Sequence, residues 1–127
     1  MSLKVGIFED DKDVAEVLTE MMQDKDFNVS SYYSFKDPSW VECNVVLGDY
    51  NNKIVSFQDL QKLCFKNDIP LIAISGGVMN YKPQLTKPFS IEELQAIILD
   101  SLMSSKTFDK RDKKSSSWIS KLIGRAS

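Results

Sequence analysis

Acidic side chains stand at two points of this 127-residue chain where an apolar run stops abruptly. Glu9 and Asp10 follow the run 3–8, and Asp49 follows the run 44–48. A carboxylate can attack a phosphoryl group as a nucleophile and form an aspartyl phosphate. Because that reaction brings two anions together, it needs compensating positive charge. Several neighbouring carboxylates readily recruit a divalent cation such as Mg²⁺, which prefers oxygen ligands.

A hydroxyl and an ammonium group follow two further apolar segments. Ser75 follows residues 70–74, and Lys87 follows Leu85 and Thr86. Each residue alone is weak evidence, since acids after a strand are usually solvated or cap a helix, and a serine there usually forms a turn. All five polar residues in this order and placement indicate a site that binds a phosphoryl group.

The elements that must position these side chains alternate between apolar strands and amphipathic helices. We expect strands at residues 3–8, 27–33, 44–49 and 70–74, with a fifth ending at residue 86. Helical spacing of apolar residues predicts three helices. The first follows Asp11 or Asp13 (apolar residues Val14, Val17, Leu18, Met21), and the second covers 56–65 (Phe57, Leu60, Leu63, Cys64). The third follows the capping box 90–93 (Leu94, Ile97, Ile98, Leu102). Fully apolar strands alternating with helices indicate an α/β fold with a parallel sheet covered on both faces. Ligands bind such sheets beyond the carboxyl ends of the strands.

These motifs resemble the receiver domain of response regulators in two-component signalling. The resemblance runs from Leu3 to about Met103 and rests on the segments 6–11, 45–49, 71–76 and 85–89. It implies a flavodoxin-like, doubly wound five-stranded parallel sheet with strand order 2-1-3-4-5. It also implies a cis peptide bond between Lys87 and Pro88.

The resemblance assigns the acids to metal binding and phosphoryl transfer. Asp49 matches the phospho-acceptor, and Glu9 and Asp10 match the acidic pair that holds Mg²⁺ together with it. Asn51 matches the position that gives a backbone carbonyl to the metal. Asp11 is a third acid at this end of the strand, and we interpret it as a helix cap rather than a ligand.

The same resemblance assigns Ser75 and Lys87 to the phosphoryl oxygens. After transfer from a histidine kinase or phosphotransfer protein, about two negative charges would sit on Asp49 where about one sat before. Movement of Ser75 toward that charge would make a local two-state switch.

Two connections depart from the pattern of the family. Only eleven residues separate Ser75 from Lys87, which predicts that the helix between strands four and five is reduced to about one turn or absent. Pro38 interrupts the short link between strands two and three, so that helix should be abbreviated. Gln84 stands where the family often has a switching aromatic residue, and Tyr81 is nearby but out of register.

Two functional hypotheses follow from a retained pocket and an altered surface. In the first, Asp49 accepts a phosphoryl group and the domain signals through protein contacts. In the second, the domain is a receiver-like interaction module that acts without phosphorylation. A nucleotide-binding enzyme is disfavoured, since no Gly-rich loop follows the first strand. The chain has no histidine, which excludes histidine-based acid–base catalysis, so we expect no enzyme activity beyond self-phosphorylation and slow hydrolysis of the phosphate.

Charge divides the chain into an acidic body and a basic end. Residues 1–103 carry nine Lys and Arg against sixteen Asp and Glu, whereas residues 104–127 carry seven against two. We interpret 1–103 as a receiver-like domain, 104–117 as a flexible basic linker and 118–127 as a short amphipathic tail. The tail could dock in a partner's groove, lie on an anionic membrane or fold back on its own domain through its apolar residues, Trp118, Ile119, Leu122 and Ile123. The tail could also be a frayed end without a role. Among the alternatives in which it is active, we favour docking to a protein.

Several features predict a cytoplasmic protein. The amino terminus does not resemble a signal peptide, and no apolar run approaches the length of a membrane span. The two cysteines, Cys43 and Cys64, lack metal-ligand spacing and are expected to be thiols. The basic end is too short for a DNA-binding domain, so we expect no direct DNA binding.

Overall fold

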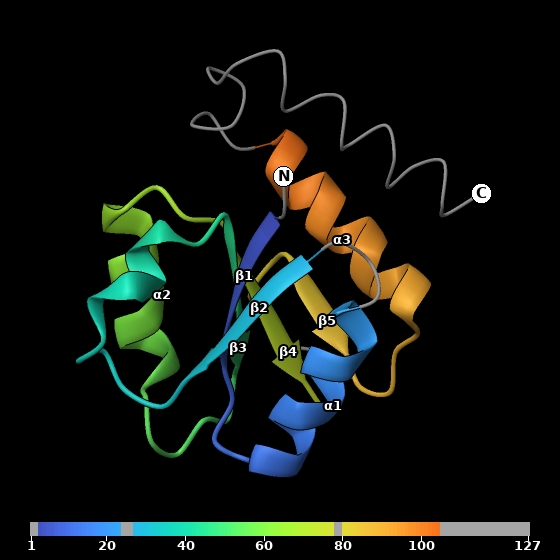
Figure 1. The fold of residues 1–127 in the computed structure, drawn as a ribbon, viewed down its shortest axis with the longest axis horizontal. Helices are drawn as coiled ribbons and strands as arrows, with labels where there is room; N and C mark the ends of the chain where they lie inside the picture. Colours follow the sequence, from blue (N-terminus) through green and yellow to red (C-terminus); the bar gives the residue numbers. More distant parts are fainter. Residues whose placement is uncertain (1–2, 24–26, 78–79, 105–127) are drawn as a thin grey trace.

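A five-stranded parallel sheet forms the centre of the protein (Figure 1). The structure, a computed structural model, describes residues 3–23, 27–77 and 80–104, so the predictions for the tail lie outside the described residues. The strand order is β2-β1-β3-β4-β5, which confirms the predicted α/β fold and its topology. The strands are β1 (Leu3–Phe8), β2 (Phe27–Tyr32), β3 (Val45–Asp49), β4 (Leu71–Ser75) and β5 (Gln84–Thr86). The helices are α1 (Lys12–Gln23), η1 (Pro38–Glu42, a 3-10 helix), α2 (Phe57–Lys66) and α3 (Ile91–Met103).

The sheet separates two apolar clusters because alternate side chains of a strand point to opposite faces. In β4, Ile72 and Ile74 join the cluster under α1 and α3, whereas Leu71 and Ala73 join the cluster under α2. Figure 1 shows α1 and α3 on one face of the sheet and α2 on the other. The three central strands, β1, β3 and β4, are therefore buried and apolar over most of their length, as a sheet covered on both faces requires.

The amino-terminal ends of the helices follow the signals in the sequence. Asp11 accepts backbone N–H groups of Asp13 (2.9 Å) and Val14 (3.4 Å), so it acts as a cap, and Ser90 opens α3 with the predicted capping box. The predicted apolar face of α1 is wrong at Val17, whose side chain is 54% exposed. Helical geometry instead buries Ala15, Leu18 and Met22, which are spaced by three and four residues. Within the described ranges, no helix is long and apolar enough to cross a bilayer.

Both shortened connections are present in the structure. A single 3-10 helix, η1, links β2 to β3, and its Trp40 is buried against Phe8 with an edge-to-face ring contact at 5.9 Å. Between β4 and β5, the described residues 76–77 and 80–83 contain no helix. Part of the sheet face beside α2 is therefore covered by loop rather than by helix.

Close packing of α2 on β3 requires a residue without a side chain at Gly48. A Cβ atom there would lie 2.7 Å from Leu60 Cδ2 and 3.2 Å from Leu71 Cδ1. We expect Gly48→Ala to lower the free energy of unfolding by about 1–3 kcal/mol through overpacking. Gly77→Ala is the control, because nothing lies within 4 Å of its Cβ position. Urea unfolding of both variants checks this, and equal midpoints would contradict it.

Candidate functional site

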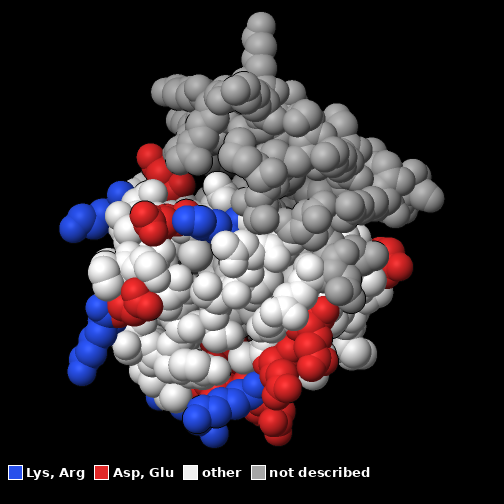
Figure 2. All heavy atoms as spheres, in the orientation of Figure 1, with Lys and Arg blue, Asp and Glu red and all other residues white. Residues whose placement is uncertain are grey.

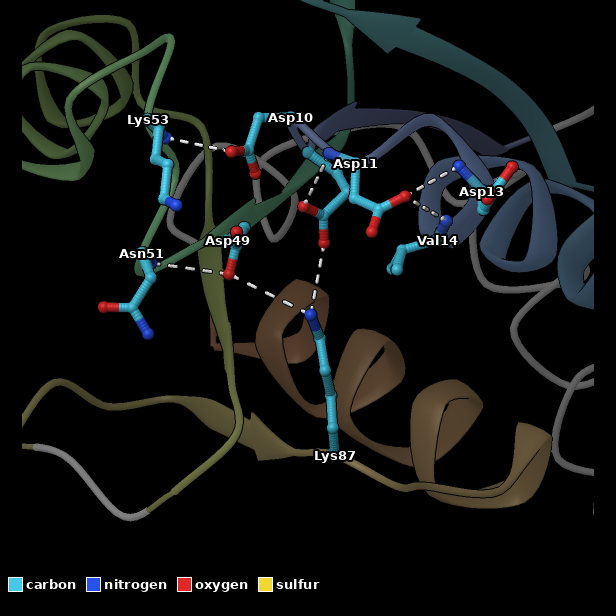
Figure 3. A network of polar contacts seen from close by, with 9 residues as sticks. Asp10, Asp11, Asp13, Val14, Asp49, Asn51, Lys53 and Lys87 are labelled. Atoms are coloured by element: carbon cyan, nitrogen blue, oxygen red, sulfur yellow. Dashed lines mark hydrogen bonds and ion pairs between the residues drawn. The ribbon is translucent and has the colours of Figure 1, made fainter.

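The acidic site forms where β1 and β3 end at the same edge of the sheet. β1 and β3 are neighbours, with Phe8 opposite Gly48, so Glu9, directly after β1, and Asp49, the last residue of β3, lie side by side. With Asp10, each offers one carboxylate oxygen, and these three oxygens lie within 4.8 Å of one another. In Figure 3 the side chains of Asp10 and Asp49 point toward a common space. In Figure 2, which has the orientation of Figure 1, acidic side chains gather near the bottom of the view, where α1 begins in Figure 1. The structure thus brings together the three acids that the sequence singled out.

Lys87 reaches this acidic cluster from the end of β5. Its backbone N–H donates to the Ser75 carbonyl (2.8 Å), which fixes the residue beside the end of β4. Its Nζ lies 3.2 Å from Glu9 Oε1 and 4.0 Å from Asp49 Oδ1 (Figure 3). The peptide bond to Pro88 is cis, as the resemblance implies, and so is the bond between Lys82 and Pro83. One ammonium group therefore faces two of the three carboxylates.

The loop after β3 wraps around the carboxylates with its backbone. The Asn51 N–H donates to Asp49 Oδ1 (3.4 Å), and the Lys53 N–H donates to Asp10 Oδ2 (3.2 Å). The side-chain amide of Asn51 points away from the acids in Figure 3, so this residue faces Asp49 through its main chain. Sequence reasoning missed the contact from Lys53, because every residue except proline carries a backbone N–H and the sequence gives no sign of where it points.

Burial makes the charge of Glu9 costly. Its side chain is only 3% exposed, and this burial raises its pKa from 4.5 to about 7, with the neighbouring Asp10 and Asp49 acting in the same direction. Lys87 lowers this pKa at a distance of 3.2 Å, but by less than burial raises it. Burial also pushes the pKa of Asp10 upward, but hydrogen bonds from Glu9 and from the Lys53 N–H outweigh it and lower that pKa. The site thus holds more negative charge than its lysine balances.

These donors fit a small divalent cation. Carboxylate oxygens from Glu9, Asp10 and Asp49 are hard ligands of the type that Mg²⁺ prefers, and Mg²⁺ commonly keeps several waters besides one or two carboxylates. A buried carboxylate with a raised pKa is the group that gains most from such a cation, since the cation offsets the cost of burying its charge.

Ser75 lies next to the site but turns its hydroxyl elsewhere. It is buried at the end of β4, one residue beyond Ile74, which pairs with Asp49. Its Oγ donates to the backbone carbonyl of Gly77. Among the hydrogen bonds of the described residues, none joins Ser75 to Asp49. The structure therefore places the Ser75 hydroxyl near Asp49, with no hydrogen bond between them among those of the described residues.

Comparison with solved structures identifies proteins of the same fold. A response regulator receiver domain from Bacillus halodurans C-125 superposes with a TM-score of 0.66 at 18% identity, covering 80% of this chain and 97% of that one. The receiver domain of a sensor histidine kinase from Pseudomonas aeruginosa PAO1, solved with magnesium in its active-site cleft, gives 0.70 at 16% identity, covering 82% and 100%. The anti-anti-sigma factor PhyR from Bartonella quintana gives 0.67 at 19% identity, covering 81% of this chain and 48% of that one. No family model and no curated protein matches the sequence.

The chain therefore has the fold of response regulator receiver domains. Several structures of this kind cover about four fifths of it, and its five strands share their order with the flavodoxin-like class.

Proposed function

We propose that this protein is a signalling receiver that accepts a phosphoryl group on Asp49 from a histidine kinase or phosphotransfer protein. The observation that carries the proposal is the convergence of Glu9, Asp10 and Asp49 within 4.8 Å, with Lys87 Nζ 4.0 Å from Asp49. Receiver domains are signalling modules, and the fold supports a role of that class. Catalysis would be limited to the domain's own phosphorylation and slow hydrolysis.

In the proposed transfer, a carboxylate oxygen of Asp49 attacks phosphorus and forms an O–P bond. The P–N bond of the donor phosphohistidine breaks, and its electron pair remains on the imidazole nitrogen, which takes up a proton. Mg²⁺ held by Glu9, Asp10, Asp49 and the Asn51 carbonyl would offset the negative charge of the carboxylates and the phosphoryl oxygens. Lys87, whose Nζ lies 4.0 Å from Asp49 Oδ1, would neutralise a phosphoryl oxygen on Asp49.

The switch would begin with a change of partner at Ser75. To donate to a phosphoryl oxygen, its hydroxyl must leave the Gly77 carbonyl, so the segment after β4 would change with it. The signal would then pass to a downstream protein through contacts that include this segment. We place this activity in the cytoplasm, in a receiver-like domain of residues 1–103 followed by the basic linker 104–117 and the tail 118–127.

A receiver-like module that works without phosphorylation is the alternative function. The hydrogen bond from Ser75 to Gly77 favours it, because the hydroxyl is already satisfied away from Asp49. The lack of a helix in the described residues between β4 and β5 would also give a different surface beside the site. In this alternative, the acidic cluster would have no role in signalling.

Binding of a phosphate mimic separates the two functions. We expect ¹H–¹⁵N NMR signals of Asn51, Ser75 and Gly77 to shift when beryllofluoride is added with millimolar Mg²⁺, because the mimic would occupy the phosphoryl position on Asp49. Beryllofluoride without Mg²⁺ is the control and should leave these signals in place. Unchanged spectra with both reagents would reject the phosphorylation switch in favour of the alternative.

A further inference from the structure

A groove lies at the end of the sheet opposite the acidic site. Its volume is about 770 Å³, far above the roughly 30 Å³ that one water occupies. It is lined by one side of α2 from Gln58 to Phe65, the residues around the start of β4, the segment around Tyr81 and Pro83, and the end of α3. In Figure 1 the ends of α2 and α3 lie at the top of the view, whereas α1 begins near the bottom. The groove is therefore separate from the proposed phosphorylation site.

The groove has an apolar floor and a polar rim. Buried Cys64, Ile69 and Leu71 lie on the floor, and Phe65 stands on the rim with 87% of its side chain exposed. Tyr81 fills part of the space where β4 and β5 have no connecting helix in the described residues. Its ring packs edge-to-face on Phe57 (5.1 Å), and its hydroxyl donates to the Leu71 carbonyl (3.0 Å). The Phe65 ring, in contrast, stays exposed, so another segment could pack against it.

The described part of the chain ends at this groove. Ser104, the last described residue, lines it together with Asp100 and Ser101. Thirteen residues, 105–117, separate Ser104 from the apolar segment that begins at Trp118. A flexible linker of that length has an end-to-end distance of roughly 20 Å and spans at most about 45 Å. Such tethering corresponds to an effective concentration on the order of millimolar, so even weak docking would be populated.

Charge also matches the groove to this segment. The rim carries the exposed carboxylates of Asp68 and Asp100, with Lys62 as the one lysine among the lining residues that the structure describes. In a helical projection of the segment, Lys121 and Arg125 lie at one edge of its apolar face, next to Trp118. Exposed ion pairs contribute little to affinity, so they would orient the segment while apolar burial holds it.

We propose that residues 118–125 dock in this groove of the same chain as a short helix. Trp118, Ile119, Leu122 and Ile123 face the floor and Phe65, and Lys121 and Arg125 face the acidic rim. Any protein that binds either the groove or the tail must then compete with this internal contact. The inference goes beyond the proposed function and does not depend on phosphorylation of Asp49.

A spin label in the tail of the full chain tests the proposal. Ser120→Cys introduces an accessible thiol in the segment, whereas Cys43 and Cys64 are buried, and burial raises the pKa of Cys64 to about 12. A nitroxide on residue 120 is expected to broaden the amide signals of Gln61, Phe65 and Asp68 in ¹⁵N-labelled protein. Amides around Val17, which is exposed on α1 across the sheet, should keep their intensity.

Two tail variants and one mixing experiment decide the outcome. Adding Trp118→Ser should restore the groove signals, whereas adding Ser116→Ala should leave them broadened. Equal broadening at Val17 and in the groove would overturn the proposal. In the mixing experiment, spin-labelled protein without ¹⁵N is added to ¹⁵N-labelled protein without a spin label. If the groove signals broaden as much as in the single-protein experiment, the tail binds a second copy and the proposal is overturned. If the groove signals stay sharp and the fluorescence emission of Trp118 shifts only when anionic phospholipid vesicles are added, the tail binds a membrane surface and the proposal is overturned.

Discussion

Asp49→Asn is expected to abolish phosphorylation of the protein. With a small phosphodonor such as acetyl phosphate and Mg²⁺, the unchanged protein should gain the mass of one phosphoryl group, and the variant should gain none. The physical reason is that an amide oxygen carries no full negative charge and is a poor nucleophile. Intact-mass spectrometry measures the gain directly, and EDTA should suppress it in the unchanged protein.

Asp11→Asn provides a matched control for this experiment. Asp11 lies two residues from Glu9, but it caps α1, and asparagine caps a helix about as well as aspartate does. This variant should be phosphorylated normally. A mass gain that persists in Asp49→Asn would show that another residue is the acceptor. No gain in any of the three proteins would support the alternative function instead.

Glu9→Gln is expected to stabilise the metal-free protein above pH 7. Glu9 has a pKa of about 7 in the folded protein against 4.5 as its ordinary value, so between these values the folded state holds more protons than the unfolded state. Stability therefore falls as pH rises through this window, and the charged carboxylate costs as much as about 3 kcal/mol above it. Glutamine removes that cost but weakens the contact with Lys87, so we expect a net gain of about 1–2 kcal/mol.

Urea unfolding in EDTA across pH 4 to 9 measures this difference. The two proteins should converge at the acidic end of this range, below the ordinary pKa of 4.5, where Glu9 is mostly protonated in both states. Saturating Mg²⁺ should reverse the order, because it stabilises the protein that keeps all three carboxylates. Glu16→Gln, on the exposed side of α1, controls for the loss of one carboxylate. A Glu9→Gln protein that is less stable than the unchanged one throughout this range would contradict the pH prediction.

The sequence was sufficient to predict the fold and the convergence of the acids. Apolar runs that end in acids predict strand ends, and parallel strands bring their carboxyl ends to one edge, so Glu9 and Asp49 had to lie together once β1 and β3 were neighbours. The capping box at Ser90 fixed the start of α3 for a similarly local reason. Short-range signals account for the ends of the strands and helices, whereas the strand order that makes β1 and β3 neighbours came from the resemblance to receiver domains.

The missed features depend on where atoms point rather than on which residues are present. The sequence places Ser75 at a strand end, but the direction of its hydroxyl is set by the backbone of Gly77. The periodicity of α1 included Val17 because valine is apolar, whereas burial depends on the angle that each residue makes with the sheet. The groove beside Phe65 was also missed, since it arises from elements far apart in the chain.

Two prolines give β5 a further consequence for self-association. An open sheet exposes the main chain of its outermost strands, which can template pairing with another molecule. β5 has three residues and stands between Pro83 and Pro88, neither of which carries an amide hydrogen. This edge strand is therefore too short a template for a strand of another molecule to pair with. β2, the opposite edge strand, has six residues and no proline, so strand addition between molecules would start there.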